Sequence, residues 1–371
     1  VLCIGSFGLA QNFTQLAILY SVGAMGVGAF HPPAAAITGH MGGRKRSKYV
    51  AFFFLAGMIG GMTGNVLIPE YVAMMTPRID GVPDTTTGLR SLLYLIPFGL
   101  VCAFMLARAT HGVGHRHTSA KSSHTEWDRS ERRQRWFAVG VLYVTNMLRF
   151  SVNMALVYLL VEWAGEITLI KNDAGMMTEA LGIKASKLNG MMQASMQVGM
   201  GGMGIVLGLI LSAKYEKLVF TLFPLMGSLA LFMIPRAHLI FEGAEVPFAI
   251  GATILTGMGF GAVIPVSISL AQRLLPHRTS LASGLMLGGA WMLAFTGPLI
   301  AELIHKGLLN KPSAPQWMLN GAQSLPEWLG TPLLEGMGLA TGFMITAGVL
   351  FLAGLIALLL PGELVRRVAR H

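Results

Sequence analysis

Residues 26–32 read Gly-Val-Gly-Ala-Phe-His-Pro, and residues 259–265, which lie 233 positions further along the chain, read Gly-Phe-Gly-Ala-Val-Ile-Pro. Each copy belongs to an apolar segment that leads into a basic loop, residues 43–48 and 272–278. A second glycine-rich apolar segment follows each loop. Self-similarity at a fixed offset indicates an internal repeat. Because both copies enter their basic loop in the same direction, we predict two halves of like orientation, related by an axis along a membrane normal.

The composition is that of a membrane protein. Of the 371 residues, 53% are hydrophobic and 12% are charged, whereas an ordinary soluble domain has about 25% charged residues. The formal net charge of +10 is spread between apolar runs and does not gather on one face, which argues against a nucleic-acid partner. The two cysteines, Cys3 and Cys102, have no disulfide or metal-site spacing. We expect no enzymatic activity, cofactor or metal, because no nucleophile–base pair, metal-ligand set or nucleotide motif is found.

Nine apolar segments are long enough to cross the bilayer, which takes about 20 helical residues. In lipid the backbone hydrogen bonds must close within each segment, so we predict helices. The segments are residues 13–38, 48–75, 89–109, 136–163, 188–213, 218–236, 246–272, 279–305 and 336–361. Residues 1–10 resemble the end of a tenth segment. The predicted fold is an all-α polytopic membrane protein with about nine full transmembrane helices plus this remnant.

One polar, His- and Ser-rich stretch interrupts the apolar pattern at residues 110–135, and we predict that it is a flexible linker. It divides the chain into an N-terminal helix bundle, residues 1–109, and a C-terminal six-helix bundle, residues 136–371. Equal halves would need six helices on each side of the linker. Since the chain begins at Val1 inside an apolar segment, we expect the N-terminal bundle to be truncated by its first two to three helices.

The orientation follows from the charges of the loops. Loops on one side carry 18 Lys and Arg residues, and loops on the other side carry 8. Lys and Arg accumulate on the cytoplasmic side. We therefore predict a multi-pass protein of the cell (inner or plasma) membrane, with the linker and the C-terminus in the cytoplasm.

Arg149 lies in the middle of segment 136–163. A charged side chain near the bilayer centre costs about 3 kcal/mol or more, so it should face a cavity or a partner. Asn146, Arg149 and Asn153 are spaced to share one face of a helix. We predict that this polar strip binds an anionic group of the substrate. The alternative is a structural charge that is paired with a carboxylate of the helices expected before Val1.

Other polar side chains interrupt the apolar segments. Gln193 and Gln197 are one turn apart, and we predict that both line the substrate cavity; hydrogen bonds between helices are the alternative. His31 is the proton-coupling candidate, since a histidine titrates at a pKa of about 6.5. It would otherwise bond a carbonyl freed by the prolines that follow it. Glu162, near the outer end of its segment, is expected to be solvated.

Two blocks carry a resemblance to a known family. Residues 26–32 and the run Ala-Gln-Arg-Leu-Leu-Pro-His-Arg at 271–278, followed by Ala-Ser-Gly-Leu at 282–285, resemble the major facilitator superfamily, and within it the fosmidomycin-resistance type of efflux protein. That family usually has an acidic residue after His-Pro, where this chain has Pro33. Its Gly-Asp-Arg-Gly-Arg type of loop is replaced by Ser-Ala-Lys-Tyr-Glu-Lys at residues 212–217.

The resemblance implies transport of a small molecule by alternating access, by a monomer in the lipid bilayer. It also places the segment of Asn65 along the N-half cavity, which makes Asn65 a substrate-binding candidate; a closely packed or kinked helix is the alternative. The favoured function is proton-coupled efflux of a drug-like or anionic compound. Uptake of a small organic anion or sugar, and a membrane protein of this fold that does not transport, remain open alternatives.

Overall fold

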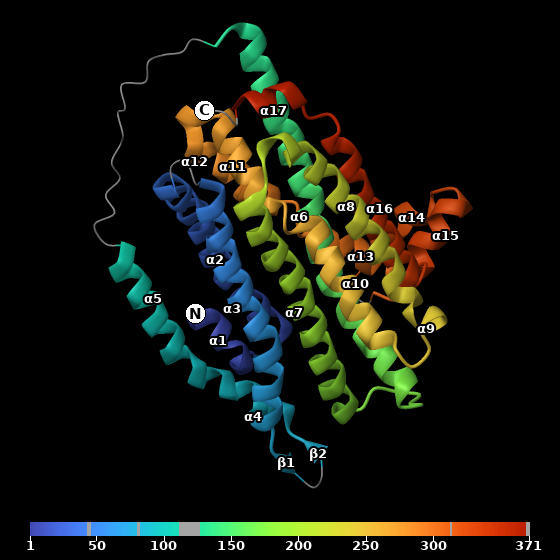
Figure 1. Ribbon diagram of the computed structural model, residues 1–371. Helices are drawn as coiled ribbons and strands as arrows, with labels where there is room; N and C mark the ends of the chain where they lie inside the picture. Colours follow the sequence, from blue (N-terminus) through green and yellow to red (C-terminus); the bar gives the residue numbers. More distant parts are fainter. Residues whose placement is uncertain (43–45, 80–81, 111–126, 312–313, 369–371) are drawn as a thin grey trace.

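The structure is a computed structural model that describes residues 1–42, 46–79, 82–110, 127–311 and 314–368. The predicted linker is described only at its edges, so the expectation for residues 111–126 lies outside the described residues. Apart from one short hairpin, the regular elements of the described chain are helices (Figure 1). The hairpin pairs β1 (Arg78–Ile79) with β2 (Val82–Pro83) in antiparallel fashion.

Before the predicted linker the described chain forms three long apolar helices and four short helical elements. They are α1 (Leu2–Gly5), η1 (Phe7–Leu9), α2 (Phe13–Gly42), α3 (Arg46–Met74), α4 (Thr85–Arg90), η3 (Ser91–Leu95) and α5 (Ile96–Thr110). Asp84 begins α4, because its Oδ1 accepts a hydrogen bond from the Thr87 main-chain N–H at 3.3 Å. The side-chain and main-chain hydrogen bonds from Thr87 hold the pKa of the exposed Asp84 carboxyl below its usual value.

The helices after the linker form a larger, well-buried group. They are α6 (Arg129–Lys171), α7 (Glu179–Ile210), η4 (Ala213–Tyr215), α8 (Glu216–Met233), η5 (Ile234–Arg236), α9 (Ala237–Ile240), α10 (Glu245–Phe260), α11 (Ile264–Leu274), η6 (Pro276–Arg278), α12 (Thr279–Ser283), the π-helix η7 (Gly284–Gly289), α13 (Thr296–Lys306), α14 (Gln316–Gln323), α15 (Glu327–Glu335), α16 (Leu339–Ala357) and α17 (Gly362–Val368). The buried apolar residues of this group make up most of the core.

Eight helical stretches in the described chain are long and apolar enough to cross a membrane, and they coincide with eight of the nine predicted segments. The ninth, residues 279–305, is not one continuous helix. It passes through α12 and the π-helix, turns at residues 292–295 and resumes as α13. The break has a local cause: Pro298 has no N–H to donate to residue 294, and a proline is tolerated only in the first turn of the new helix.

The two copies of the repeat have different backbones. In the first copy, α2 runs without interruption from Phe13 to Gly42. In the second copy, α10 ends at Phe260 and α11 begins at Ile264, with Pro265 in its first turn. The repeat predicted equivalent segments in the two halves, but it did not predict that only the second would be divided.

Helix α6 has 43 residues and begins at Arg129, within the stretch predicted as linker. A rise of about 1.5 Å per residue makes it about 65 Å long, roughly twice the thickness of the hydrocarbon core. It therefore extends beyond the bilayer. Figure 1 shows the start of α6 together with α11, α12 and α17 at one end of the molecule, here called the basic end, and the β1–β2 hairpin at the opposite end.

The two groups of helices pack against each other mainly through α3 and α7, which lie side by side in Figure 1. Toward the basic end, α2 also contacts α12 and the π-helix, and α3 contacts α11. The α3–α7 interface is close because small residues face it. A Cβ at Gly190 of α7 would collide with the main-chain oxygen of Asn65, and one at Gly61 of α3 would collide with the side chain of Gln197.

Candidate functional site

Arg149 is completely enclosed by protein, with a relative exposure of 0%. Its Nη1 donates to Asn146 Oδ1 at 3.2 Å, and its Nη2 donates to the main-chain oxygen of Phe220 on α8 at 3.1 Å. The guanidinium carbon also lies 5.6 Å from the centre of the Phe220 ring. Nε has no hydrogen-bond partner, and Arg149 forms no ion pair, among the residues that the structure describes. A buried charge with an unused donor is thus present inside the C-terminal group.

Asn146 connects Arg149 to a second helix. Its Nδ2 donates to Ser267 Oγ of α11 at 2.9 Å and approaches the main-chain oxygen of Met286 in the π-helix at 3.3 Å. Ser267 in turn donates to the main-chain oxygen of Ile264 at 2.8 Å. The network therefore joins α6, α8, α11 and the π-helix, and all of these elements belong to the C-terminal group.

Asn153 extends the same face of α6 by one turn. Its side chain is only 8% exposed, and its buried Oδ1 has no hydrogen-bond partner among the described residues. Buried polar atoms are almost always satisfied, so an orphan atom needs a reason such as a water molecule or a ligand. Asn153 Oδ1 and Arg149 Nε are two such atoms on one helix, an acceptor and a donor.

The two glutamines of α7 contact different neighbours. Gln193 donates from Nε2 to the main-chain oxygen of Val157 on α6 at 3.2 Å, and it also contacts Asn189 Oδ1 at 3.3 Å. Gln197 instead lies against Gly61 of α3, and its buried Oε1 has no partner in the described part of the chain. Gln193 thus links two helices of one group, whereas Gln197 lies at the α3–α7 interface.

Asn65 and His31 lie in the N-terminal group. Asn65 is half-buried, and its main-chain oxygen lies against Gly190 across the α3–α7 interface. His31 Nδ1 lies 2.9 Å from the main-chain oxygen of Val27, one turn back in its own helix. Pro32 and Pro33 have no N–H to donate to the carbonyls of residues 28 and 29, so this contact is not the one that the structural alternative for His31 described. Its ring also makes an edge contact with the Phe53 ring at 6.2 Å.

The structure brings the predicted residues together in two places. Asn146, Arg149 and Asn153 share the buried face of α6, and Gln197 and Asn65 lie along the α3–α7 interface. Ser267 and the Phe220 carbonyl, which bond Asn146 and Arg149, were not predicted from the sequence. A serine within an apolar run carries no distinctive signal, and a main-chain oxygen carries none at all.

A buried ion pair lies at the basic end. Arg273 Nη2 of α11 is 2.5 Å from Glu216 Oε1 at the start of α8. Glu216 is 4% exposed, and its Oε2 has no partner among the described residues. Beside it, Arg135 of α6 donates to the main-chain oxygen of Leu274 at 3.0 Å. Three helices are therefore tied together here, and Glu216 belongs to the loop that departs most from the family pattern.

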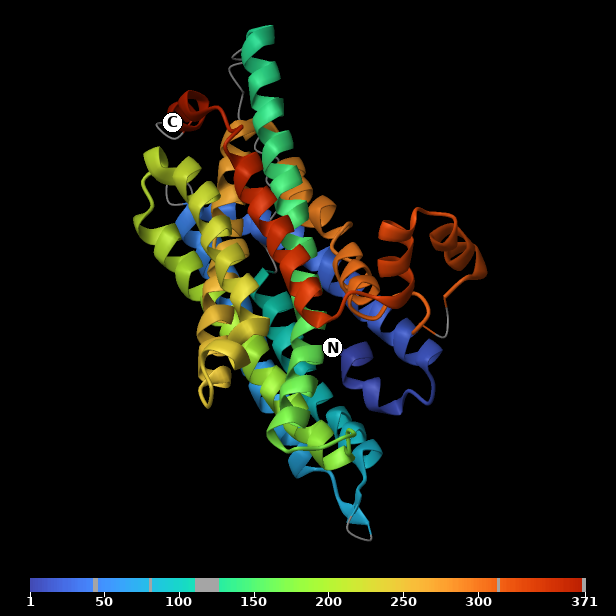
Figure 2. The same ribbon diagram turned by 90° about the vertical axis from the view of Figure 1, so that its right-hand side faces the viewer.

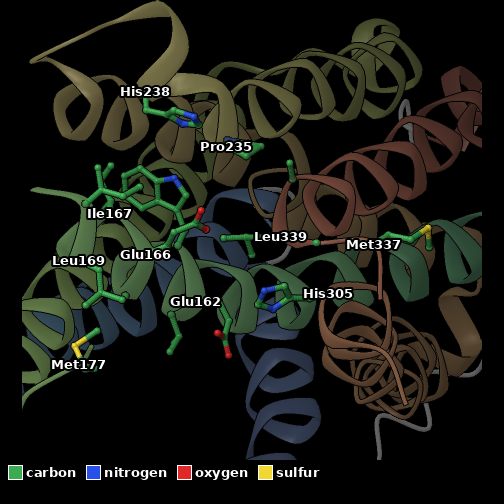
Figure 3. A pocket seen from close by; sticks show the side chains of 16 residues that line it. Glu162, Glu166, Ile167, Leu169, Met177, Pro235, His238, His305, Met337 and Leu339 are labelled. Carbon is green, nitrogen blue, oxygen red and sulfur yellow. The ribbon is translucent and has the colours of Figure 1, made fainter. Parts of the chain in front are cut away.

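A cavity of about 660 Å³ lies at the opposite end of the C-terminal group, between α6, α9, α13 and the start of α16 (Figure 3). Glu162, Glu166, His238 and His305 line it. Glu162 was expected to be solvated, but it is half-buried and its Oε1 lies 2.6 Å from Lys306 Nζ. His305 Nδ1 lies 3.1 Å from the Tyr158 hydroxyl. None of the predicted site residues lines this cavity.

Within the described ranges, no group of three or more His, Cys, Asp or Glu side chains is placed to hold a metal ion.

The family model described as Major Facilitator Superfamily matches residues 1–298 of the chain. A search of curated proteins found no matching relative.

Proposed function

The chain belongs to the Major Facilitator Superfamily, and we propose that it exports a small anionic or drug-like compound in exchange for protons. Membership makes it a multi-pass membrane protein of the all-α fold of that family, which serves the transport of small molecules across membranes. The direction of transport, the coupling to protons and the anionic character of the substrate are the proposal.

The proposal of an anionic substrate rests on one observation. Arg149 is wholly buried without a carboxylate partner among the described residues. A charge in a membrane-spanning helix is costly and marks a pathway or a binding site by default. An oxyanion would accept a charge-assisted hydrogen bond from the free Nε. The orphan Oδ1 of Asn153 would accept a hydrogen bond from a donor group of the same compound.

The α3–α7 interface supports alternating access. It joins the two groups of helices, and small residues allow the two backbones to approach closely there. Transporters of this kind work by rocking one bundle against the other around a central site. We propose that α3 and α7 move against each other about this contact and that Gln197 binds substrate when the interface opens.

We further propose that the basic end faces the cytoplasm, since loops on that side carry most of the Lys and Arg residues. The Glu216–Arg273 pair would then hold the cytoplasmic ends of α8 and α11 together, so that the C-terminal group moves as one unit. His31 remains the proposed proton carrier. A ring that donates from Nδ1 to Val27 leaves Nε2 available for a second proton.

The experiment that tests this proposal measures flux of radiolabelled fosmidomycin, a small phosphonate, into inside-out membrane vesicles under a pH gradient. Arg149→Gln should lower the initial rate about tenfold or more, since a hydrogen bond to a charged group contributes about 1.5–3 kcal/mol. The matched control is Arg236→Gln, because Arg236 also bonds a main-chain oxygen, that of Phe232 at 2.7 Å, but lies at the opposite end. Unchanged flux in a folded Arg149→Gln protein would exclude Arg149 from the mechanism. Flux that is independent of the pH gradient would exclude proton coupling.

A further inference from the structure

A second cavity, of about 620 Å³, lies at the basic end and is separate from the site described above. It opens between the start of α6 on one side and Pro361 and α17 on the other, which Figure 2 shows at the same end of the molecule. Its lining is Ser130, Arg133, Gln134, Phe137, Pro361, Gly362, Glu363, Leu364 and Arg367. Two arginines from elements more than 200 residues apart in sequence thus meet at one hollow.

The α6 side of this cavity is one helical face. Ser130, Arg133, Gln134 and Phe137 recur at spacings of three and four residues, so their side chains lie one above another. Arg129 precedes Arg133 by one turn and adds a further positive charge to the same face. The face therefore changes from cationic and polar at its outer edge to aromatic at Phe137.

No described residue forms an ion pair with the charged side chains of the cavity. Arg133 and Arg367 are exposed and form no ion pair with any residue that the structure describes. Glu363 also lines the cavity and is likewise without an ion pair in that part of the chain. Two guanidinium groups against one carboxylate leave the lining positive, and Ser130 and Gln134 add neutral donors.

The cavity lies where the membrane interface is expected along α6. Trp136, next to Phe137, is partly exposed where α6 leaves the apolar part of its sequence, and aromatic residues of this kind mark the membrane interface. Helix α17 buries Leu364, Val365 and Val368 against the bundle and exposes Arg366 and Arg367. This is the pattern of a helix that lies flat at the end of the bundle with its basic side outward.

Exposed apolar side chains, here called the apolar rim, lie in the segments that border the charged hollow. Phe137 of α6 is 53% exposed, and Leu358 and Leu359, just before Pro361, are 51% and 58% exposed. Helices α6 and α16 pack together, so this rim continues into the lipid-facing surface of both helices. A free phosphate ion would use only the charged hollow, whereas a phospholipid would use the hollow and the rim together.

We propose that this cavity binds the phosphate headgroup of an anionic phospholipid from the leaflet at the basic end. Arg133 and Arg367 bind the phosphate oxygens, and the acyl chains lie over Phe137, Leu358 and Leu359. Basic pockets between transmembrane helices are suited to such headgroups. The lipid links the start of α6, which follows the predicted linker, to α17 at the end of the C-terminal group. This inference does not depend on which compound the protein transports.

The test is native mass spectrometry of the purified protein in detergent, titrated with phosphatidylglycerol or with phosphatidylcholine. Arg133→Gln/Arg367→Gln should lower the retention of phosphatidylglycerol about tenfold, since each arginine contributes a charge-assisted hydrogen bond. The matched control is Arg132→Gln/Arg366→Gln, which removes the same charge from exposed neighbours that do not line the cavity. It should change retention less than about twofold, in line with the small effect of exposed charges.

Three outcomes would overturn the proposal. Equal losses in the two double variants would mean general attraction to a basic surface. Equal retention of phosphatidylcholine by the unaltered protein would mean that headgroup charge is irrelevant. Displacement of phosphatidylglycerol by millimolar inorganic phosphate would identify the ligand as a free anion. As a check on folding, phosphatidylglycerol should raise the melting temperature of the control variant and not that of Arg133→Gln/Arg367→Gln.

Discussion

Arg273 at the end of α11 lies 2.5 Å from Glu216 at the start of α8, and the two side chains are only 19% and 6% exposed. This ion pair connects α8 and α11 at the basic end. The hydrogen bond from Arg135 to the main-chain oxygen of Leu274 lies beside it. A buried ion pair of this kind adds little net stability by itself, but the loss of one partner leaves an uncompensated charge. Both helices belong to the C-terminal group, so the pair fixes α8 and α11 to each other at the basic end of that group.

Breaking the Glu216–Arg273 pair should lower the stability of the folded protein. Arg273→Gln leaves the Glu216 carboxylate buried without its cation, and we expect a loss of about 3 kcal/mol in the free energy of unfolding. Thermal unfolding of the purified protein in detergent measures the loss. The charge-swapped double variant Glu216→Arg/Arg273→Glu should recover part of it. A melting temperature that is unchanged in Arg273→Gln would show that the pair does not form in solution.

The α3–α7 interface should not tolerate added volume at Gly190. Gly190→Ala places a Cβ against the main-chain oxygen of Asn65, so we expect a lower melting temperature and reduced transport. The matched control is Gly202→Ala on the same helix, where the new Cβ meets no atom within 4 Å. That variant should gain about 1 kcal/mol at most from helix propensity. If the two variants behave alike, the close contact between α3 and α7 is not present.

Much of the fold follows from the sequence. Runs of about 20 apolar residues with few charges are sufficient to identify helices that span a bilayer, and eight of the nine segments are such helices. The interruption of residues 279–305 escaped prediction, because hydropathy does not report helix breaks. Its local causes are the π-helix over Gly284–Gly289 and the proline at position 298. The repeat likewise gave no indication that α10 would end at Phe260.

The candidate site was predictable only within single helices. The spacing of Asn146, Arg149 and Asn153 places them on one face, as the structure shows. Their partners on other helices, Ser267 and the Phe220 carbonyl, depend on how the helices pack, which spacing within one helix does not reveal. The same limit explains why Gln193 and Gln197, one turn apart, contact different helices.

Asn146 should depend on Ser267 for its orientation. Ser267→Ala removes the hydroxyl that accepts from Asn146 Nδ2, and we expect a loss of about 1–2 kcal/mol in unfolding free energy. Asn146 would then hold Arg149 less firmly, so transport should fall as well. Thermal unfolding and vesicle flux measured on the same preparations separate the two effects. Ser324→Ala, at an exposed hydroxyl that bonds only within its own turn, is the control. Unaltered stability and flux in Ser267→Ala would mean that this hydrogen bond is dispensable.

His31 should affect the pH dependence of flux if it carries protons. We expect His31→Ala to flatten the rise of transport with the pH gradient, because alanine cannot carry a proton. The comparison is His31→Gln, which can keep a donor toward the Val27 carbonyl but cannot titrate. Flux measured as a function of pH distinguishes the two roles. A normal pH profile in both variants would make His31 purely structural.

The central claim is that Arg149 binds an anionic substrate. Equilibrium binding of radiolabelled fosmidomycin to the purified protein tests it most directly, because binding is measured apart from gating and coupling. We expect Arg149→Gln to raise the Kd about tenfold or more and Arg236→Gln to leave it unchanged. An Arg149→Gln protein that remains folded and binds the phosphonate with the affinity of the unaltered chain would contradict the claim.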